Sequence, residues 1–280
     1  MAKNKTKIQG KQAFDSYYEE IFSSRWPKLK SALLEETCPV GFCPFEKETY
    51  FLDKASLYAA SCLPLGENAL RILDMCAAPG GKTLVLAKRM AQDAHLYSNE
   101  RSPERKSRLV KVCTEHLDED TLSRVHCSCS DAATWCTKAN LEPFDAILLD
   151  APCSSERHVL CDSKYLSVWT PSRVKTLSMA QWALLSCAYR LLNNGGHILY
   201  STCALNPTEN DGVVSKLLKK FPESCVIKDC SPCQDLFGFE KDFESLSPEK
   251  TEYGFHILPD SSNGAGPLYF SLIQKIESDF

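Results

Sequence analysis

The sequence has 280 residues, of which 44% are apolar and 24% are charged, and its formal net charge is −4. These values are typical of an ordinary soluble globular protein and exclude a polycation or a low-complexity chain. They also exclude a membrane-spanning helix, because no apolar run approaches the roughly 18 residues that cross a bilayer.

Fifteen cysteines are present, which is an odd number and a high one. Cys62, Cys113 and Cys187 lie within apolar patterns, where a reduced thiol packs as a small hydrophobic group. We therefore expect a reducing compartment, the cytoplasm, with a mitochondrial location left open for a eukaryotic source. A zinc site formed by Cys225, Cys230 and Cys233 is the less favoured alternative.

The first 64 residues predict a mainly helical extension. The stretch MAKNKTKIQGK is basic and lacks the apolar core of a secretory signal, so we expect a flexible basic arm. Apolar residues then recur at helical spacing over 11–36, and Pro27 indicates a break or restart. The stretch ETYFLD predicts a strand, and KASLYAASCL predicts a short helix.

From residue 65 to 280 the pattern changes, and strand-like runs alternate with helical ones. Strands are predicted at RILDM, HLYSNE, RVHCS, FDAILLD, HILYST and, last, GPLYFSLIQKI, whereas 230–252 reads as an acidic loop. Helices are predicted after Gly81, Pro103, Pro171 and Pro207. This alternation predicts a doubly wound, mostly parallel α/β sheet, whose carboxyl edge collects the ligand-binding residues.

A small-residue loop, ILDMCAAPGGKT, joins the first of these strands to its helix. We predict a cofactor-binding loop that consists of Cys76, Ala77, Ala78, Pro79, Gly80, Gly81 and Lys82. A phosphate loop would need glycine where Cys76 stands, so S-adenosylmethionine is the favoured ligand. Glu100 ends the next strand and could bind a ribose diol. Asp131 could accept from an adenine amino group or could cap a helix.

Two thiols follow strand ends in similar settings. Cys153 comes after Asp150 and Pro152 in LLDAPCSSERH, and Cys203 ends YSTC. Buried cysteines that merely pack are the alternative for either one alone. Two thiols at neighbouring strand ends beside a cofactor loop instead favour catalysis.

LDMCAAPGGKT, DAPCSS and YSTCALNPTEN, in this order, strongly resemble the Sun/Nop family of RNA cytosine-C5 methyltransferases over residues 50 to 276. Within it, the chain resembles the short branch that includes the mitochondrial small-subunit rRNA enzyme. The resemblance implies that Cys203 adds to carbon 6 of cytosine, that Cys153 helps release the product, and that the methyl group comes from S-adenosylmethionine. Asp150 would act near ring nitrogen 3 and line the cofactor site.

The resemblance also implies an RNA partner, with ribosomal RNA favoured and transfer RNA as the alternative. We expect a monomer, with a protein partner that aids RNA binding left open. A phosphate-loop protein and a non-catalytic RNA-binding scaffold are the competing functions.

One departure concerns the loop after Cys153, where much of the family has Ser-Gly-x-Gly and this chain has SSERHVL. Arg157 could meet a phosphate or pair with Glu156. Asn206, Glu209 and Asn210 shape the pocket or cap a helix. Trp169 is expected in the core, and the basic run 101–111 is either an RNA-binding patch or a solvated helix face.

Overall fold

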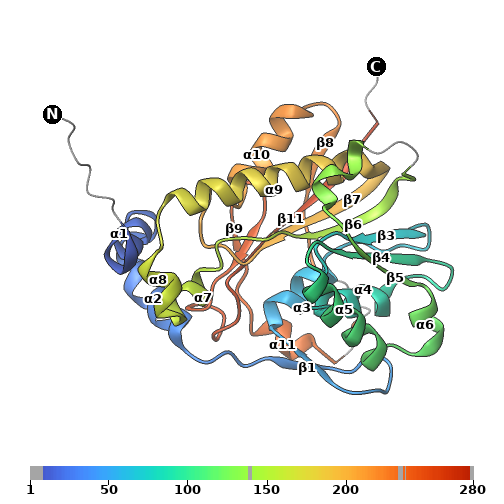
Figure 1. Cartoon of the computed structure of the whole chain (residues 1–280), viewed down its shortest axis with the longest axis horizontal. Helices are drawn as coiled ribbons and strands as arrows, with labels where there is room; N and C mark the ends of the chain where they lie inside the picture. Colours follow the sequence, from blue (N-terminus) through green and yellow to red (C-terminus); the bar gives the residue numbers. More distant parts are fainter. Residues whose placement is uncertain (1–8, 138–140, 233–235, 237, 278–280) are drawn as a thin grey trace.

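The structure, a computed structural model, describes residues 9–137, 141–232, 236 and 238–277. Its centre is a nine-stranded sheet with helices on both faces (Figure 1). The strand order is β5-β4-β3-β6-β7-β11-β10-β9, and β8 also pairs with β11. The strands are β3 (Arg71–Asp74), β4 (His95–Glu100), β5 (Val125–Cys129), β6 (Phe144–Asp150), β7 (Leu192–Thr202), β8 (Cys225–Lys228), β9 (Glu249–Lys250), β10 (Phe255–Ile257) and β11 (Leu268–Lys275). The predicted fold class is confirmed.

The five strands from β5 to β7 are parallel, and β11 runs antiparallel to β7. Ile147, Leu148 and Leu149 in β6 are fully buried, which explains the unbroken apolar run FDAILLD, since a central parallel strand is covered on both faces. Because β3, β4, β6 and β7 point the same way, their carboxyl ends meet at one edge. The polar motifs predicted to share a site therefore lie at that edge.

Two layers of helices cover the sheet. One layer contains α3 (Lys54–Ser61), α4 (Gly81–Arg89) and α5 (Pro103–His116), with α6 (Glu119–Ser123) after it; the other contains α9 (Ser172–Leu191) and α10 (Asp211–Lys220). Leu84 and Leu109 are fully buried in the core of the first layer, as Leu185 and Val214 are in that of the second. The helices predicted after Gly81, Pro103 and Pro171 begin within a residue of those positions, whereas α10 begins four residues after Pro207.

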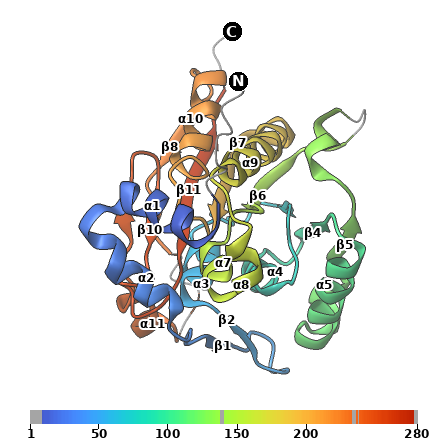
Figure 2. The same cartoon turned by 60° about the vertical axis from the view of Figure 1, so that its left-hand side comes forward.

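A third core lies beside the carboxyl edge (Figure 2), where the N-terminal helices meet the short helices that follow β6. Its helices are α1 (Gly10–Phe22), the 3-10 turn η1 (Ser23–Arg25), α2 (Trp26–Leu34), α7 (Glu156–Cys161) and α8 (Ser163–Ser167). Phe14, Tyr18 and Trp26 pack there against Trp169, which is a core residue as expected. Pro27 lies at the start of α2, so the predicted restart is confirmed.

The elements that the sequence did not reveal are short. They are β1 (Val40–Phe42), α6, the 3-10 turn η2 (Ala132–Thr137), α7, α8, α11 (Glu240–Glu244), β8, β9 and β10. The prediction of a loop over 230–252 is therefore wrong at α11 and β9. The predicted strand in ETYFLD is β2 (Tyr50–Leu52), which pairs with β1. Strands of two to four residues carry too few side chains for a period of two to stand out.

The described part of the first 64 residues, 9–64, shares cores with the rest of the chain. Leu57 of α3 lies in the same buried cluster as Leu84 of α4, and Arg25 forms ion pairs with Glu249 and Asp260. A division at residue 64 stays a prediction, since these contacts join the two parts without deciding it.

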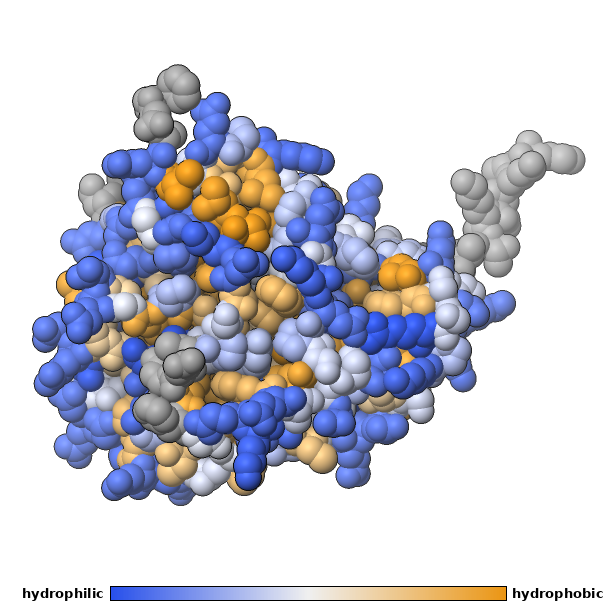
Figure 3. Space-filling view, turned by 180° about the vertical axis from the view of Figure 1, so that it is seen from behind, coloured by the Kyte–Doolittle hydropathy of each residue, from blue (hydrophilic) through white to orange (hydrophobic). Residues whose placement is uncertain are grey.

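The surface seen from behind is mainly hydrophilic at its rim, with apolar side chains gathered in smaller areas between (Figure 3). Within the described ranges, every helix lacks either the length or the apolar character that crossing a bilayer requires.

Candidate active site

Two adjoining cavities open at the carboxyl edge of the sheet. The larger, of about 990 Å³, reaches Cys153 and Cys203, and the smaller, of about 220 Å³, lies against the loop that precedes α4. The residues that line both are Asp53, Ser56, Cys76, Ala78, Lys82 and Asp150. A group bound at the loop therefore has an open path to the thiols.

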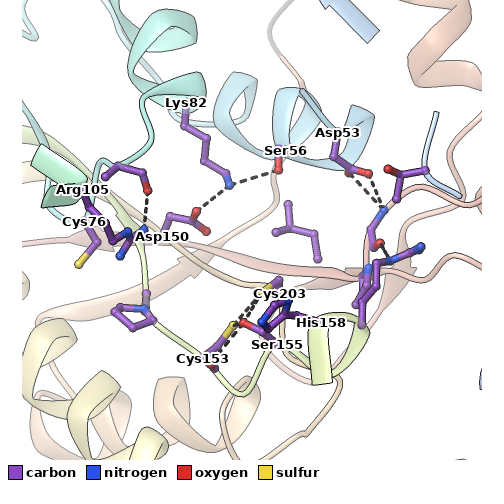
Figure 4. Close-up of a pocket in the computed structure, with 18 of the residues that line it drawn as sticks. Asp53, Ser56, Cys76, Lys82, Arg105, Asp150, Cys153, Ser155, His158 and Cys203 are labelled. Atoms are coloured by element: carbon purple, nitrogen blue, oxygen red, sulfur yellow. Dashed lines mark hydrogen bonds and ion pairs between the residues drawn. The ribbon is translucent and has the colours of Figure 1, made fainter. Parts of the chain in front are cut away.

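The two predicted thiols face each other within the larger cavity (Figure 4). The Sγ atoms of Cys153 and Cys203 are 2.8 Å apart, and the Ser155 Oγ lies 3.3 Å from the Cys203 Sγ. A hydrogen bond from Cys153, with a further one from Ser155, lowers the pKa of Cys203 against the effect of burial. The bond to Cys203, together with burial, raises the pKa of Cys153. These two opposite directions favour Cys203 over Cys153 as the thiol that ionises.

A buried carboxylate fixes the loop that carries Cys153. Glu156 accepts hydrogen bonds from the hydroxyls of Tyr18 and Ser154 and from the backbone N–H of Leu205. Leu205 follows Cys203 by two residues, so one side chain joins both thiol-bearing loops to α1. Burial raises the pKa of Glu156. The alternative of a Glu156–Arg157 ion pair is therefore wrong.

A second buried carboxylate supports the same loop from the other side. Glu209 Oε2 accepts from the Ser154 backbone N–H at 2.9 Å and from Gln181 Nε2 at 2.9 Å. Gln181, on α9, also donates to the carbonyl of Pro152. Burial and then the charge of Glu156 raise the pKa of Glu209 to about 7. Glu209 thus holds the thiol loop and does not line the cavities.

Asparagines brace the loop after β7. Asn206 donates to the hydroxyl of Tyr17, and Asn210 accepts from Thr202 and donates to the carbonyl of Ala204. Asn210 precedes α10 but forms no capping hydrogen bond with its side chain. Neither side chain lines the two cavities, and Asn206 Oδ1 accepts from the Thr208 backbone N–H in the turn before α10. The expectation that these residues shape the pocket or cap a helix stays a prediction.

Asp150 and Lys82 form an ion pair on the facing wall (Figure 4). Lys82 Nζ donates to Asp150 Oδ2 at 2.7 Å, and Ser201 Oγ donates to Oδ1 at 2.9 Å. Burial acts to lower the pKa of Lys82, but the charge of Asp150 and the hydrogen bond to it, together with Cys203 and Asp74, outweigh burial and raise the pKa. A phosphate-loop lysine must be free to bind phosphates. The pairing of Lys82 with Asp150 and the presence of Cys76 in place of glycine are therefore both evidence against a phosphate loop.

Small residues form the loop that precedes α4, and the reason for a small residue differs from one position to the next. Gly80 has a φ of 125°, a region that favours glycine. A Cβ on Gly81 would lie 2.8 Å from Tyr50 Cε1, so this glycine makes room for a protein side chain. Ala77, Ala78, Pro79 and Gly81 line the smaller cavity.

Asp74, which the sequence analysis did not single out, also lines the smaller cavity. It ends β3 and is 1% exposed; Oδ2 accepts from Thr83, while Oδ1 has no hydrogen-bond partner within the described residues. Burial raises its pKa to about 7. Its position directly before the small-residue loop was the signal that could have identified it.

Glu100 ends β4 as predicted but lies behind Arg105. Glu100 Oε1 accepts from the Ser102 backbone N–H, and Arg105 Nη1 lies 3.1 Å from Oε2. Arg105 also donates to the Ala78 carbonyl and lines the larger cavity. Arg105 thus lines the larger cavity although its side chain is 48% exposed, and whether the 101–111 run is an RNA-binding patch or a solvated helix face stays a prediction.

The remaining predicted site residues lie farther out. Asp131 accepts from the backbone N–H of Ala133 at the start of η2, and it lines neither cavity. Arg157 donates to the carbonyls of Glu35, Gly264 and Gly266 at the cavity rim. Cys225 and Cys230 join no group of three or more potential metal ligands in the described part of the chain, and Cys233 lies outside it.

Residues 60–269 match the family model described as 16S rRNA methyltransferase RsmB/F. Ribosomal RNA small subunit methyltransferase F of Erwinia tasmaniensis is 36% identical over 79% of this chain and 44% of its own length. The relative of the same name from Klebsiella pneumoniae is 35% identical over 78% and 42%. The chain thus spans less than half the length of these curated relatives.

Solved structures share the fold. NSun6 from Pyrococcus horikoshii, solved with SFG, has a TM-score of 0.64 at 23% identity over 82% of this chain and 54% of its own. A methyltransferase homologue from the same organism has a TM-score of 0.67 at 20% identity and covers 95% of both chains. The motifs, the paired thiols and the matched region together establish that the chain belongs to the 16S rRNA methyltransferase RsmB/F family.

Proposed function

We propose that this chain transfers a methyl group from S-adenosylmethionine to carbon 5 of a cytosine in ribosomal RNA. The observation that carries the proposal is the pair of thiols, 2.8 Å apart, in a cavity that continues to the small-residue loop. One thiol would form a bond to the base and the other would assist its release.

The residues around the smaller cavity fit the methyl donor. Ala77, Ala78 and Pro79 present a surface with little side-chain bulk. Within this cavity, the buried Asp74 Oδ1 accepts no hydrogen bond from the described residues, whereas Glu100 Oε2 is ion-paired with Arg105 and lines neither cavity. An unpaired buried acceptor suits a ligand that carries hydroxyl and ammonium donors. When bound, the donor supplies an activated methyl group.

The binding roles follow from these positions. We propose that the loop from Cys76 to Lys82 holds the donor, including Gly80 and Gly81 at the start of α4. Glu100 would hold the ribose once Arg105 moves aside. The adenine role of Asp131 stays a prediction that no contact supports. Asp150, at the cavity wall, would touch both the donor and the cytosine.

The chain's own groups divide the covalent chemistry. The thiolate of Cys203 adds to carbon 6 of the cytosine, which makes carbon 5 electron-rich enough to take the methyl group. Asp150, held by Lys82 and Ser201, lies where it can hydrogen-bond the base near nitrogen 3. Methyl transfer would leave S-adenosylhomocysteine. A general base then takes the proton from carbon 5, the electrons of that C–H bond form the carbon 5–carbon 6 double bond, and the bond between sulfur and carbon 6 breaks with its electron pair returning to Cys203 as a thiolate. Cys153 is placed to assist this last step.

Ribosomal RNA is the proposed substrate because the curated relatives are named for it. Transfer RNA is the alternative within the same chemistry, and a protein partner that supplies RNA affinity fits the net charge of −4. The chain would act as a monomer. A reducing compartment such as the cytoplasm is proposed, since both thiols must stay reduced.

The test is transfer of a labelled methyl group from S-adenosylmethionine to small-subunit rRNA, with the modified base identified by nucleoside mass spectrometry. We expect 5-methylcytosine in rRNA, background activity for Cys203→Ala, and full activity for the control Cys129→Ala, which alters an exposed thiol. Calorimetry should show equal donor binding by wild type and Cys203→Ala. No donor binding by the wild type would contradict the proposal and favour a non-catalytic scaffold.

A further inference from the structure

A third side chain touches the reacting sulfur. The Ser155 Oγ lies 3.3 Å from the Cys203 Sγ and 3.6 Å from the Cys153 Sγ, and all three side chains line the larger cavity (Figure 4). A sulfur atom accepts hydrogen bonds over this distance, and a thiolate accepts them more strongly than a thiol.

The backbone places this hydroxyl at a conformational cost. Ser155 has a φ of 53° and a ψ of 59°, a left-handed conformation that a side chain disfavours. Much of the family that the motifs resemble has glycine here, which adopts this conformation freely. A serine held in a glycine conformation with its hydroxyl toward two thiols indicates a role for the hydroxyl.

The loop is rigid enough to hold that hydroxyl in place. The Ser154 backbone N–H donates to Glu209, the Val159 backbone N–H donates to the Ser155 carbonyl, and Glu156 is fully buried beneath. On this loop, the hydroxyl of Ser155 has two competing acceptors, the Cys153 carbonyl at 3.4 Å and the Cys153 Sγ at 3.6 Å. A charged sulfur is a stronger acceptor than either of these.

We propose that Ser155 is a further catalytic residue, whose hydroxyl donates a hydrogen bond to the Sγ of Cys203 and stabilises its thiolate. The inference rests on the proposed function, in which Cys203 is the nucleophile. Stabilising the thiolate assists twice: it raises the fraction ready to add to carbon 6, and it stabilises the sulfur as it leaves with the electron pair. The hydrogen bonds from Cys153 and Ser155 act in the same direction on the Cys203 pKa.

Other charged groups also act on this sulfur. Asp150 at the end of β6 and Glu156 on α7 oppose its ionisation, whereas Lys82 on α4 favours it. The test must therefore change Ser155 alone. Ser155→Gly removes the hydroxyl and keeps the backbone conformation, so we expect it to fold at least as well as the wild type.

The experiment measures alkylation of Cys203 by iodoacetamide from pH 6 to pH 10, quantified on its own peptide by mass spectrometry. A hydrogen bond to the sulfur that increases the ratio of thiolate to thiol about tenfold also makes each thiolate a weaker nucleophile, by about threefold. For Ser155→Gly we expect a rate about threefold lower at pH 7 and a limiting rate about threefold higher at high pH. The two curves should cross, while Cys129, measured in the same digest, stays unchanged.

Superimposable curves would overturn the proposal and indicate that Ser155 donates to the Cys153 carbonyl instead. An equal change at every pH would also overturn it, because that result indicates altered access. Ser155→Ala, which lacks the hydroxyl but keeps a Cβ, should give the same crossing. Alkylation needs neither RNA nor methyl donor. If the curves of the wild type and Ser155→Gly cross but the wild type transfers no methyl group, the proposed function is contradicted and the role of Ser155 is not.

Discussion

The loop before α4 and the loop after β6 both follow the carboxyl end of a parallel strand, yet they are held in different ways. The loop before α4 is fixed by neighbours in the sheet, through Thr83 to Asp74 and the Ala77 backbone N–H to Asn99. The loop with Cys153 is fixed by side chains from α1 and α9, namely Tyr18 and Gln181. Tyr18 and Glu156 lie 138 residues apart in the sequence.

This difference shows which residues hold each part of the site in its conformation. The loop before α4 depends on small residues and on local contacts, so its motif is visible in the sequence. The thiol loop depends on buried carboxylates that distant elements satisfy. Changes far from the thiols in the chain should therefore disturb the second loop and leave the first intact.

The largest expected effect tests the support of the thiol loop directly. Glu156→Ala leaves the hydroxyls of Tyr18 and Ser154 and the Leu205 N–H without their acceptor. We expect the free energy of unfolding to fall by about 3–5 kcal/mol, since each buried donor left unpaired costs roughly 1–3 kcal/mol. Denaturant titration measures it. Tyr18→Phe, which removes one donor, should cost only about 1 kcal/mol. Equal losses in the two variants would contradict this role of Glu156.

The next effect concerns pH. Burial raises the pKa of Glu209 from 4.5 to about 7, so the folded chain binds this proton more tightly than the unfolded chain. Its contribution to stability is complete below about pH 4.5 and is lost as the pH rises through about 7. Glu209→Gln removes that loss, so its stability relative to the wild type should rise by about 2–3 kcal/mol between pH 4.5 and pH 8.

Urea titrations at several pH values provide the measurement. Asp74, whose pKa is also raised to about 7, is unchanged in both proteins and cancels in the comparison. Glu223→Gln, on an exposed side chain, is the control variant. A difference between Glu209→Gln and the wild type that stays flat with pH would mean that folding does not raise the pKa of Glu209, and it would contradict this account.

The smallest effect belongs to the loop before α4. Gly81→Ala places a Cβ 2.8 Å from Tyr50 Cε1, and we expect a loss of about 1–2 kcal/mol in the free energy of unfolding. Tyr50→Leu should relieve most of that loss in the double variant, as thermal unfolding would show. Gly66→Ala is the matched control, since nothing lies within 4 Å of its Cβ. No coupling between positions 81 and 50 would contradict the local account of this loop.

Much of the fold could be predicted because strong periodic signals mark its centre. Each predicted strand of the parallel sheet exists, and FDAILLD is the buried centre that its composition indicates. The segment after residue 222 could not be read in the same way. Its strands are two to four residues long until β11. Pairing fixes them rather than their own pattern, since β8 and β10 pair with β11 and β9 pairs with β10.

The site was predictable as a set of strand ends but not as a set of contacts. The sequence placed Cys153, Cys203, Asp150 and the loop 76–82 at one edge. It did not show that Arg105 turns inward over Glu100, or that Lys82 pairs with Asp150. Nor did it indicate Ser155. The hydroxyl of Ser155 faces two sulfurs because the backbone there is left-handed, and a serine in the sequence does not predict that conformation.

The division of labour between the thiols is the central claim, and trapping the covalent complex with RNA tests it most directly. Cys153→Ala, incubated with rRNA and S-adenosylmethionine, should accumulate an RNA–protein adduct that survives denaturing electrophoresis and maps to Cys203. Cys203→Ala should form none. An adduct with Cys203→Ala and none with Cys153→Ala would reverse the two roles and contradict the account.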